Sequence, residues 1–293
     1  MRRGLAFAPA VLVLVAAAGP AHAARREERV PTRYMPGPVP VLVATPPSYD
    51  AEPLRRYPVL YFLHDGQGDE AVLFRQGLAD ALDAAMRGGR LPEMLIVCPR
   101  GTGTWWVDAF DGSRRMASFL SDDLVPFVDR TYRTRAARGS RLVAGISMGG
   151  YGALRWALAR PDLFVAAGGL SPAIQALSVP SVAAMPFFIR PSLEAVFGAD
   201  PVLNDLRKDD LYQMLLDDAS LAGRAPYLIA RCGTEDKYRL SEIVGFFDRF
   251  ASAVGLAHEI RLETGVHDWP YWRRVFLDFV SSVAARLGPG GAP

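Results

Sequence analysis

Residues 141–150 read RLVAGISMGG, and no other stretch indicates the architecture so strongly. A short apolar run leads into Gly145-Ile146-Ser147-Met148-Gly149, which matches the pattern G-x-S-x-G. In that pattern a strand turns abruptly into a helix, and the serine lies at the strained corner with its hydroxyl exposed. Glycines stand two places on either side because a Cβ there would collide with the neighbouring strand and helix. We therefore expect a strand, a tight turn and a small-residue helix, with Ser147 as a nucleophile.

Apolar runs alternate with helix-like stretches on both sides of this turn. Short strands that are apolar throughout are typical of a mostly parallel sheet covered by helices on both faces. The predicted fold class is therefore α/β. Strands are expected within 39–50, 56–66, 93–101, 141–146, 163–172, 226–236 and 257–265, and helices within 72–87, 118–132, 152–159 and 271–286.

The first residues resemble an export signal. Met1-Arg2-Arg3 supplies a positive start, an apolar run extends from Leu5 to Ala18, and Ala21-His22-Ala23 fits the small-x-small cleavage rule. The run is too short to span a bilayer comfortably. We expect residues 1–23 to be a signal peptide cleaved after Ala23, for a secreted or periplasmic protein, with an uncleaved anchor as the alternative.

The rest of the chain is expected to form one domain. Residues 24–34 are charged and are predicted to be a flexible lead-in, residues 35–288 the α/β domain, and 289–293 a disordered tail. The stretch 172–225 interrupts the strand-helix rhythm and is interpreted as an insertion after the sixth strand. It either lies over the active site or is an ordinary surface excursion.

Charge and cysteine content exclude several classes of protein. The chain has 33 Lys+Arg and 31 Asp+Glu, so removing Arg2 and Arg3 leaves 31 against 31. A neutral chain gives no reason to expect nucleic acid or stable membrane insertion. Cys98 and Cys232 lie in strands expected to be separated by three others, roughly 19 Å, whereas a disulfide needs Cα atoms within about 7 Å. Two buried free thiols are expected, and no metal or organic cofactor.

A serine hydroxyl needs a base within hydrogen-bond reach. His267 follows the last predicted strand, at the sheet edge where parallel strands deliver their loops. His258 lies within a strand-like run, and His64 precedes the Asp65-Gly66 loop and is expected to shape it. We therefore predict His267 to be the base.

The orienting acid should follow the strand before that of the base. There the sequence reads CGTEDKY, which offers Glu235 and Asp236. Asp236 is preferred, and Glu235 remains an alternative. The order Ser147, Asp236, His267 is the chain order of serine triads on this kind of sheet.

The negative charge of a tetrahedral intermediate requires two backbone N–H groups that already point at it. The residue after the nucleophile, Met148, supplies one. The other is expected from the loop after an earlier strand, where Gln67 is favoured and Gly66 is the alternative.

These residues together resemble a known family, the esterase D-like branch of the α/β-hydrolase fold. Its members include feruloyl and acetyl-xylan esterases, S-formylglutathione hydrolases and antigen 85 mycolyltransferases. The resemblance rests on the segments PVPVLVATPPSYD, RYPVLYFLHDG, WWVDAF, AGISMGGYGAL, CGTED and GVHDWPYW, which span nearly all of the expected mature chain.

The resemblance implies a triad of Ser147, Asp236 and His267 and an oxyanion hole at Met148 and Gln67. It also implies that Asp65 occupies a sugar-holding position and that three tryptophans lie in loops lining an acyl or leaving-group pocket: Trp105, Trp106 and Trp269. For each tryptophan, a place in the core is the alternative to contact with substrate. The sequence departs from two members. It lacks the cysteine loop of S-formylglutathione hydrolases after Gly66, and Gln67-Gly68-Asp69 replaces the arginine that follows the Asp-Gly pair in antigen 85.

Three functions are compatible with this pattern. The first is an exported serine esterase that hydrolyses a small-molecule or carbohydrate ester through an acyl-Ser147 intermediate. The second is an acyltransferase that passes the acyl group to a sugar or lipid hydroxyl. The third is an inactive binding protein on the same scaffold. The sequence gives no indication of the oligomeric state.

Overall fold

The computed structural model describes residues 24–174, 190–199 and 206–288. Within them an eight-stranded sheet has the order β1-β2-β4-β3-β5-β6-β7-β8. The pairs β1/β2 and β2/β4 are antiparallel, and all the other neighbouring pairs are parallel. The strands are β1 Arg25–Val30, β2 Val39–Ala44, β3 Val59–Leu63, β4 Leu95–Pro99, β5 Arg141–Ile146, β6 Ala166–Leu170, β7 Tyr227–Gly233 and β8 His258–Glu263. The α/β fold class predicted from the sequence is confirmed.

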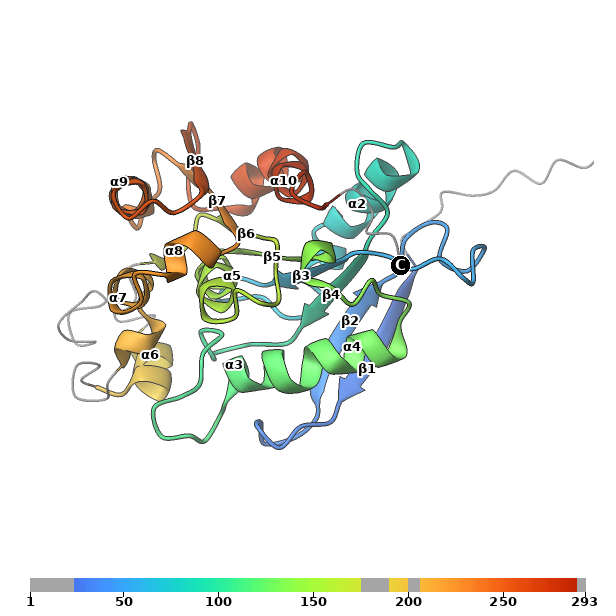
Figure 1. Ribbon diagram of the computed structural model, residues 1–293, viewed down its shortest axis with the longest axis horizontal. Helices are drawn as coiled ribbons and strands as arrows, with labels where there is room; N and C mark the ends of the chain where they lie inside the picture. The colour runs from blue at the N-terminus through green and yellow to red at the C-terminus, as the bar shows by residue number, and fades with distance from the viewer. Residues whose placement is uncertain (1–23, 175–189, 200–205, 289–293) are drawn as a thin grey trace, which may run out of the picture.

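Helices cover both faces of this sheet (Figure 1), with α2 and α10 on one side and α4 and α5 on the other. Gly77, at φ 70°, divides the helix expected over 72–87 into α1 and α2. The helices are α1 Val72–Arg75, α2 Leu78–Arg87, α3 Met116–Ser118, η1 Phe119–Leu124, α4 Val125–Thr131, η2 Arg138–Ser140, α5 Met148–Ala159, α6 Arg190–Phe197, η5 Leu206–Asp209, α7 Leu211–Asp217, α8 Leu221–Arg224, α9 Leu240–Ala253 and α10 Trp269–Ala284.

Two cores result from the period-2 alternation of strand side chains. In β3, Tyr61 faces the core that contains α4 and α5, whereas Leu60 and Phe62 face the core that contains α2 and α10. Every residue of β3 is buried, as a strand with both faces covered requires. Phe62 meets Phe276 of α10 in an edge-to-face pair, with ring centroids 5.8 Å apart. The central strands are thereby held rigidly at the point where β5 ends.

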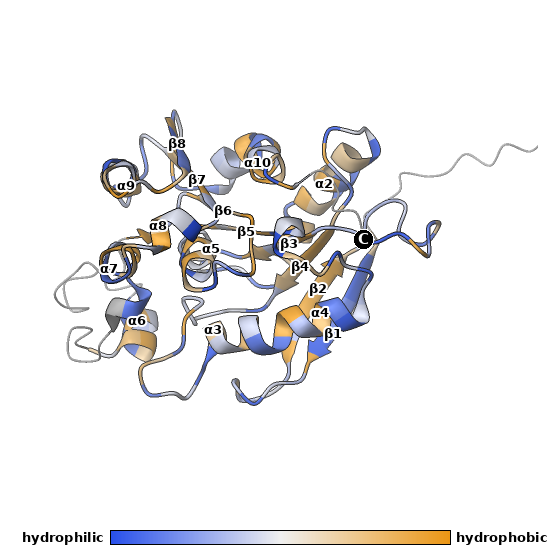
Figure 2. Cartoon of the chain, viewed as in Figure 1, coloured by the Kyte–Doolittle hydropathy of each residue, from blue (hydrophilic) through white to orange (hydrophobic). Residues whose placement is uncertain are grey.

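The segment expected to be a flexible lead-in is instead the edge strand β1. All six of its residues pair with β2, from Arg25 opposite Ala44 to Val30 opposite Val39. Figure 2 shows β1 as a hydrophilic strand beside the hydrophobic β2. The charges obscured the strand in the sequence, because an edge strand is held by backbone hydrogen bonds and charged side chains protect its open edge from further pairing. Tyr132 also donates a hydrogen bond to Glu28, 2.6 Å.

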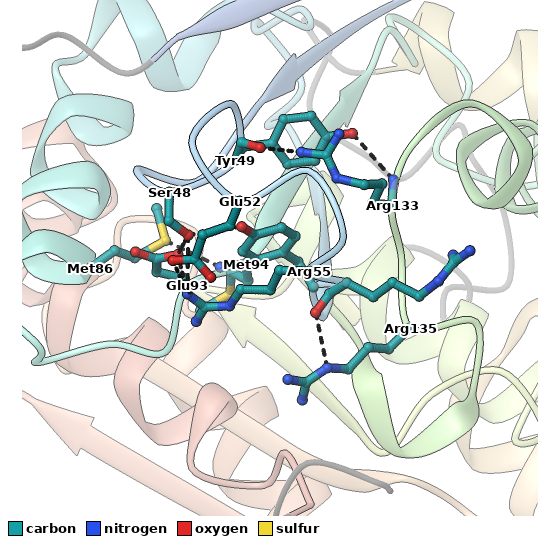
Figure 3. Close-up of polar contacts among 11 residues, drawn as sticks. Ser48, Tyr49, Glu52, Arg55, Met86, Glu93, Met94, Arg133 and Arg135 are labelled. Atoms are coloured by element: carbon teal, nitrogen blue, oxygen red, sulfur yellow. Dashed lines mark hydrogen bonds and ion pairs between the residues drawn. The ribbon is translucent and has the colours of Figure 1, made fainter. Parts of the chain in front are cut away.

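The loop between β2 and β3 lies at the amino-terminal edge of the parallel strands, opposite the end of β5 (Figure 3). Arg55 joins Glu52 and Glu93 at 3.1 and 3.2 Å. The Arg133 guanidinium lies 3.7 Å from the ring centroid of Tyr49. These contacts hold the long connection between β2 and β3 in place. We therefore interpret the residues at this edge of the sheet as stabilising the fold.

Part of the predicted insertion lies outside the described residues, at 175–189 and 200–205, as do the predicted signal peptide (1–23) and tail (289–293). The described part holds α6, η5, α7 and α8 between β6 and β7. It is tied to helix α5, because Arg155 forms an ion pair with the buried Asp209 at 2.5 Å. Among the described helices, none has the length and apolar character that crossing a bilayer requires.

The two cysteines are free and buried. Cys98 lies in β4 and Cys232 in β7, with β3, β5 and β6 between them. The prediction that they do not pair is confirmed.

The Phe62–Phe276 contact gives a test of the core. Replacing Phe276, which has no exposed surface, by alanine should lower the free energy of unfolding by about 3–5 kcal/mol, because a large buried ring is lost and a cavity remains. Urea denaturation followed by circular dichroism measures this change. Leu54→Ala, at a side chain that is 95% exposed, is the matched control and should leave the unfolding free energy nearly unchanged.

Candidate active site

Ser147 occupies the sharp turn between β5 and α5. Its backbone has φ 54° and ψ −115°, a conformation that non-glycine residues rarely adopt. A Cβ at Gly149 would overlap the carbonyl oxygens of Leu63 and His64, and one at Gly145 would overlap the backbone of Gly149. The two glycines therefore let α5 start directly against β3. A residue with a Cβ at either position would overlap main-chain atoms of this turn.

The backbone of Ser147 is held on both sides. Its N–H donates to the carbonyl of Leu170 at 2.8 Å, and its own carbonyl accepts from Ala173 N at 3.1 Å. Both partners belong to the end of β6 and the residues after it. The strained turn is thus fastened to the neighbouring strand.

The carboxyl ends of three parallel strands bring the polar residues together. Ser147 follows β5, Asp236 follows β7 and His267 follows β8. His267 Nδ1 lies 2.7 Å from Asp236 Oδ2, and His267 Nε2 lies 2.9 Å from Ser147 Oγ. Because an ionised carboxylate only accepts, Nδ1 carries the proton and donates to it, and Nε2 is then free to accept from the serine hydroxyl.

Of the two carboxylates proposed from the sequence, the structure brings Asp236 to the histidine. Glu235 is exposed, while the Asp236 side chain has no exposed surface. Asp236 Oδ1 accepts from the backbone N–H of Tyr238 at 2.9 Å, which fixes the carboxylate plane. Asp268 serves a different purpose, as the cap of α10 that accepts from Tyr271 N.

The His267 imidazole packs between two aromatic rings. Tyr238 and Trp272 each lie 4.9 Å from its centroid, with interplanar angles of 80° and 82°. The His267 side chain is only 7% exposed. Rotation of the ring away from Ser147 would therefore displace one aromatic neighbour or the other.

The other two described histidines have structural partners. His64 is buried, its Nδ1 donates to the carbonyl of Asp65 at 2.7 Å, and its Nε2 accepts from Gly101 N at 2.9 Å. Burial lowers the pKa of His64 below its usual value. His258 contacts the carbonyl of Leu256 and the carboxylate of Asp248. Neither reaches Ser147.

The expected oxyanion donors come from two elements, the start of α5 and the loop after β3. Met148 is the first residue of α5, so its N–H is one of those that a helix leaves without an intrahelical acceptor. Gln67 N–H points toward Asp65 Oδ2 over a long 3.4 Å. Gly66 remains the alternative donor, and no neighbouring atom approaches the position of a Cβ there. The assignment of the second donor remains a prediction.

The residues expected to bind substrate differ in their surroundings. Asp65 is buried in the loop after β3, and its Oδ1 has no hydrogen-bond partner among the described residues. Trp105 is buried too, and its indole N–H donates to Ser192 of α6 at 3.2 Å. Trp269 is half-buried at the start of α10. For these three residues, contact with substrate remains a prediction.

Of the two alternatives for Trp106, the structure supports the core position. Its side chain has no exposed surface, and its indole N–H donates to the carbonyl of His64 at 3.3 Å. The ring fills the space left by two glycines, Gly101 and Gly152, where a Cβ would overlap it. Trp106 is therefore a core residue that supports the His64 loop.

Sequence reasoning missed two residues beside the site. Ser171 follows β6 and accepts a hydrogen bond from Trp272 Nε1 at 3.1 Å. His267 was predicted because it is a polar residue shortly after a parallel strand, and Ser171 has the same position relative to β6. Trp272 gave no such signal, because an aromatic residue in an amphipathic helix is ordinarily a core residue. In the part of the chain that the structure describes, no group of three His, Cys, Asp or Glu residues is arranged to hold a metal ion.

Comparison with known proteins supports one family. The family model described as "Putative esterase" matches residues 32–222. An esterase of Mycobacterium tuberculosis is 37% identical over 111 residues, covering 35% of this chain and 22% of that protein. An acetyl esterase of Caldicellulosiruptor saccharolyticus is 24% identical over 184 residues, covering 61% of this chain and 67% of that protein.

The fold is shared with solved structures. A ferulic acid esterase structure superposes with a TM-score of 0.77 at 20% identity, covering 91% of this chain and 99% of the other. The region that matches the esterases of Mycobacterium tuberculosis covers 22% of the length of those proteins. The family match ends at residue 222, so Asp236 and His267 are assigned from their geometry in this chain.

The turn at Ser147 gives a prediction. Gly149→Ala should lower the free energy of unfolding by about 3 kcal/mol or more, because its Cβ overlaps the main chain of β3, which cannot yield as a side chain would. Urea denaturation is the measurement. Gly223→Ala is the control, since its Cβ would meet no neighbour within 4 Å. Equal stability of the two variants would contradict the packing described for α5.

The buried His64 gives a prediction about pH. Its pKa is lowered in the folded state, so the unfolded chain takes up the proton first, near 6.5. The stabilisation is present above that pH and is lost as the pH falls through it. Between about pH 7.5 and about pH 5, unfolding free energy should fall more in the wild type than in His64→Gln, measured by urea denaturation. Parallel curves for the two proteins would refute this.

Proposed function

The chain belongs to the family described as "Putative esterase", and on that premise we propose that it is an exported serine esterase that hydrolyses carboxylic esters. The proposed intermediate is an acyl group carried on Ser147. The observation that supports it best is the directed chain of hydrogen bonds from Ser147 through His267 to Asp236. Export is proposed from the signal-like sequence of residues 1–23.

In the proposed acylation step, Ser147 Oγ attacks the ester carbonyl carbon while His267 Nε2 takes its proton. The 2.9 Å separation of these atoms suits a direct transfer. Asp236 holds the imidazole in the tautomer that accepts at Nε2 and stabilises the imidazolium that forms. Collapse of the tetrahedral intermediate breaks the bond to the alcohol oxygen, which receives the proton from His267.

The oxyanion of that intermediate needs donors that exist before substrate binds. We assign them to Met148 N and Gln67 N. Met148 is well suited because it lies at the start of a helix, whose dipole also favours negative charge there. Gln67 would exchange its long contact with Asp65 for the oxyanion.

In the proposed deacylation step, water replaces the alcohol, and its oxygen bonds to the acyl carbon while His267 takes its proton. Collapse of this second tetrahedral intermediate breaks the bond to Ser147 Oγ, which receives the proton from His267, and the carboxylic acid is released. Transfer to a sugar or lipid hydroxyl is the second candidate, and it differs only in the acceptor. Asp65 supports this second candidate. It is buried, one of its carboxylate oxygens has no hydrogen-bond partner among the described residues, and a sugar hydroxyl would donate to that oxygen.

The proposal is tested with a fluorophosphonate probe on the purified protein. We expect labelling of the Ser147 peptide, identified by mass spectrometry, with complete loss in Ser147→Ala. His267→Ala should slow labelling and the hydrolysis of a short-chain nitrophenyl ester by about a thousandfold or more, because the hydroxyl then lacks its base.

Ser252→Ala, at an exposed position of α9, is the control and should behave as the wild type. Folded protein that is neither labelled nor active would favour the third function, an inactive binding protein. Analysis of products with a disaccharide present separates the first two functions. Free acid alone supports hydrolysis, whereas an acylated sugar in excess over free acid supports transfer.

A further inference from the structure

Ser171 is the residue directly after β6, at the same sheet edge as Ser147. Its side chain is fully buried and its backbone has φ 46°, in the left-handed region that favours glycine. The backbone N–H of Ser171 donates to the carbonyl of Arg231 in β7. A serine held in this conformation, where glycine would cost less, points to a task for its hydroxyl.

That hydroxyl lies between two groups that belong to different elements. Trp272 Nε1 of α10 donates to Ser171 Oγ at 3.1 Å. The Ser171 hydroxyl also lies beside the Cys232 thiol, to whose sulfur it can donate, and that thiol in turn lies 3.7 Å from Asp236 Oδ2. Burial raises the pKa of Cys232 to about 12, so the thiol keeps its proton.

The direction of each hydrogen bond in this series is determined at both ends. An indole N–H only donates, and an ionised carboxylate only accepts. Ser171 must therefore accept from Trp272 and donate to Cys232, and Cys232 must donate to Asp236. Ser171 and Cys232 each accept one hydrogen bond and donate one through a single atom, and of the two only Ser171 accepts from a residue of α10.

The series closes on itself through the histidine. Asp236 accepts a hydrogen bond from His267 at 2.7 Å. The His267 ring in turn packs against the Trp272 ring, with the two centroids 4.9 Å apart. The buried groups Trp272, Ser171, Cys232, Asp236 and His267 thus form a ring in which each member restrains the next. A buried network with every donor paired specifies one arrangement of its members.

We propose that Ser171 is a positioning residue that holds the Trp272 indole against His267 and orients Asp236 through Cys232. The inference rests on the proposed function, because it concerns the same serine, base and acid. Without the hydroxyl, Trp272 Nε1 loses its acceptor and Cys232 loses its donor. The imidazole then samples orientations in which Nε2 does not face Ser147 Oγ.

The test compares Ser171→Ala, Trp272→Phe and the double variant on a nitrophenyl ester. Both single variants remove the same hydrogen bond, from opposite ends. We expect kcat to fall about 10- to 100-fold in Ser171→Ala with KM changed less than about twofold, because bound substrate is untouched while the base is misplaced. The kcat of the double variant should be no lower than that of the less active single variant, since the shared interaction is already absent.

A second measurement does not depend on turnover. The proton on His267 Nδ1 should give a downfield NMR resonance in the wild type that broadens or disappears in Ser171→Ala. Thr45→Ala is the control, since it removes a buried hydroxyl that has no hydrogen-bond partner among the described residues, at the opposite edge of the sheet. It should keep both the resonance and the kcat of the wild type.

Wild-type kcat and an unchanged resonance in folded Ser171→Ala would overturn the inference, as would losses that multiply in the double variant. If Ser171→Ala does not fold, folded Trp272→Phe with wild-type kcat is the overturning result. A wild type that is inert to fluorophosphonate would count against the proposed function alone. The resonance in the two single variants would still decide the role of Ser171.

Discussion

The absence of space for a Cβ between the start of α5 and the end of β3 is the constraint on which the rest of this structure depends. Gly145 and Gly149 allow the helix to begin against the main chain of the neighbouring strand, and Ser147 between them is forced into a left-handed conformation. Every other polar group of the site is placed relative to that corner. The neighbouring strand fastens it, since Leu170 and Ala173 bind both ends of the Ser147 peptide unit.

Much of this arrangement follows from local sequence. Parallel strands buried on both faces are apolar throughout, so β3, β4 and β5 were recognisable as runs, and polar residues after such runs had to meet at one edge. Ser147 was predicted from the G-x-S-x-G motif, and Asp236 and His267 from their places after such runs; the structure brings the three side chains together. The burial of Trp106 could not be predicted in this way, because it depends on two glycines, Gly101 and Gly152, that leave room for the ring.

The edge strand β1 and the ring around Ser171 show two further limits of local sequence. Strand β1 is charged, and only its pairing with β2 makes it a strand. The series from Trp272 to Asp236 joins residues of α10, β7 and the end of β6, which no spacing in the sequence brings together. Hydrogen-bond direction becomes an argument only once the partners are known.

The proposed nucleophile, Ser147, and its proposed base, His267, are separated by 120 positions in the chain. Ser147 is made before β7 and β8, which carry the acid and the base to the sheet edge. A chain that emerges amino terminus first can therefore form the strained corner early while its hydroxyl stays an ordinary alcohol. In the proposed mechanism, Ser147 becomes reactive only when the last third of the polypeptide docks, so partly synthesised molecules would carry no activated serine.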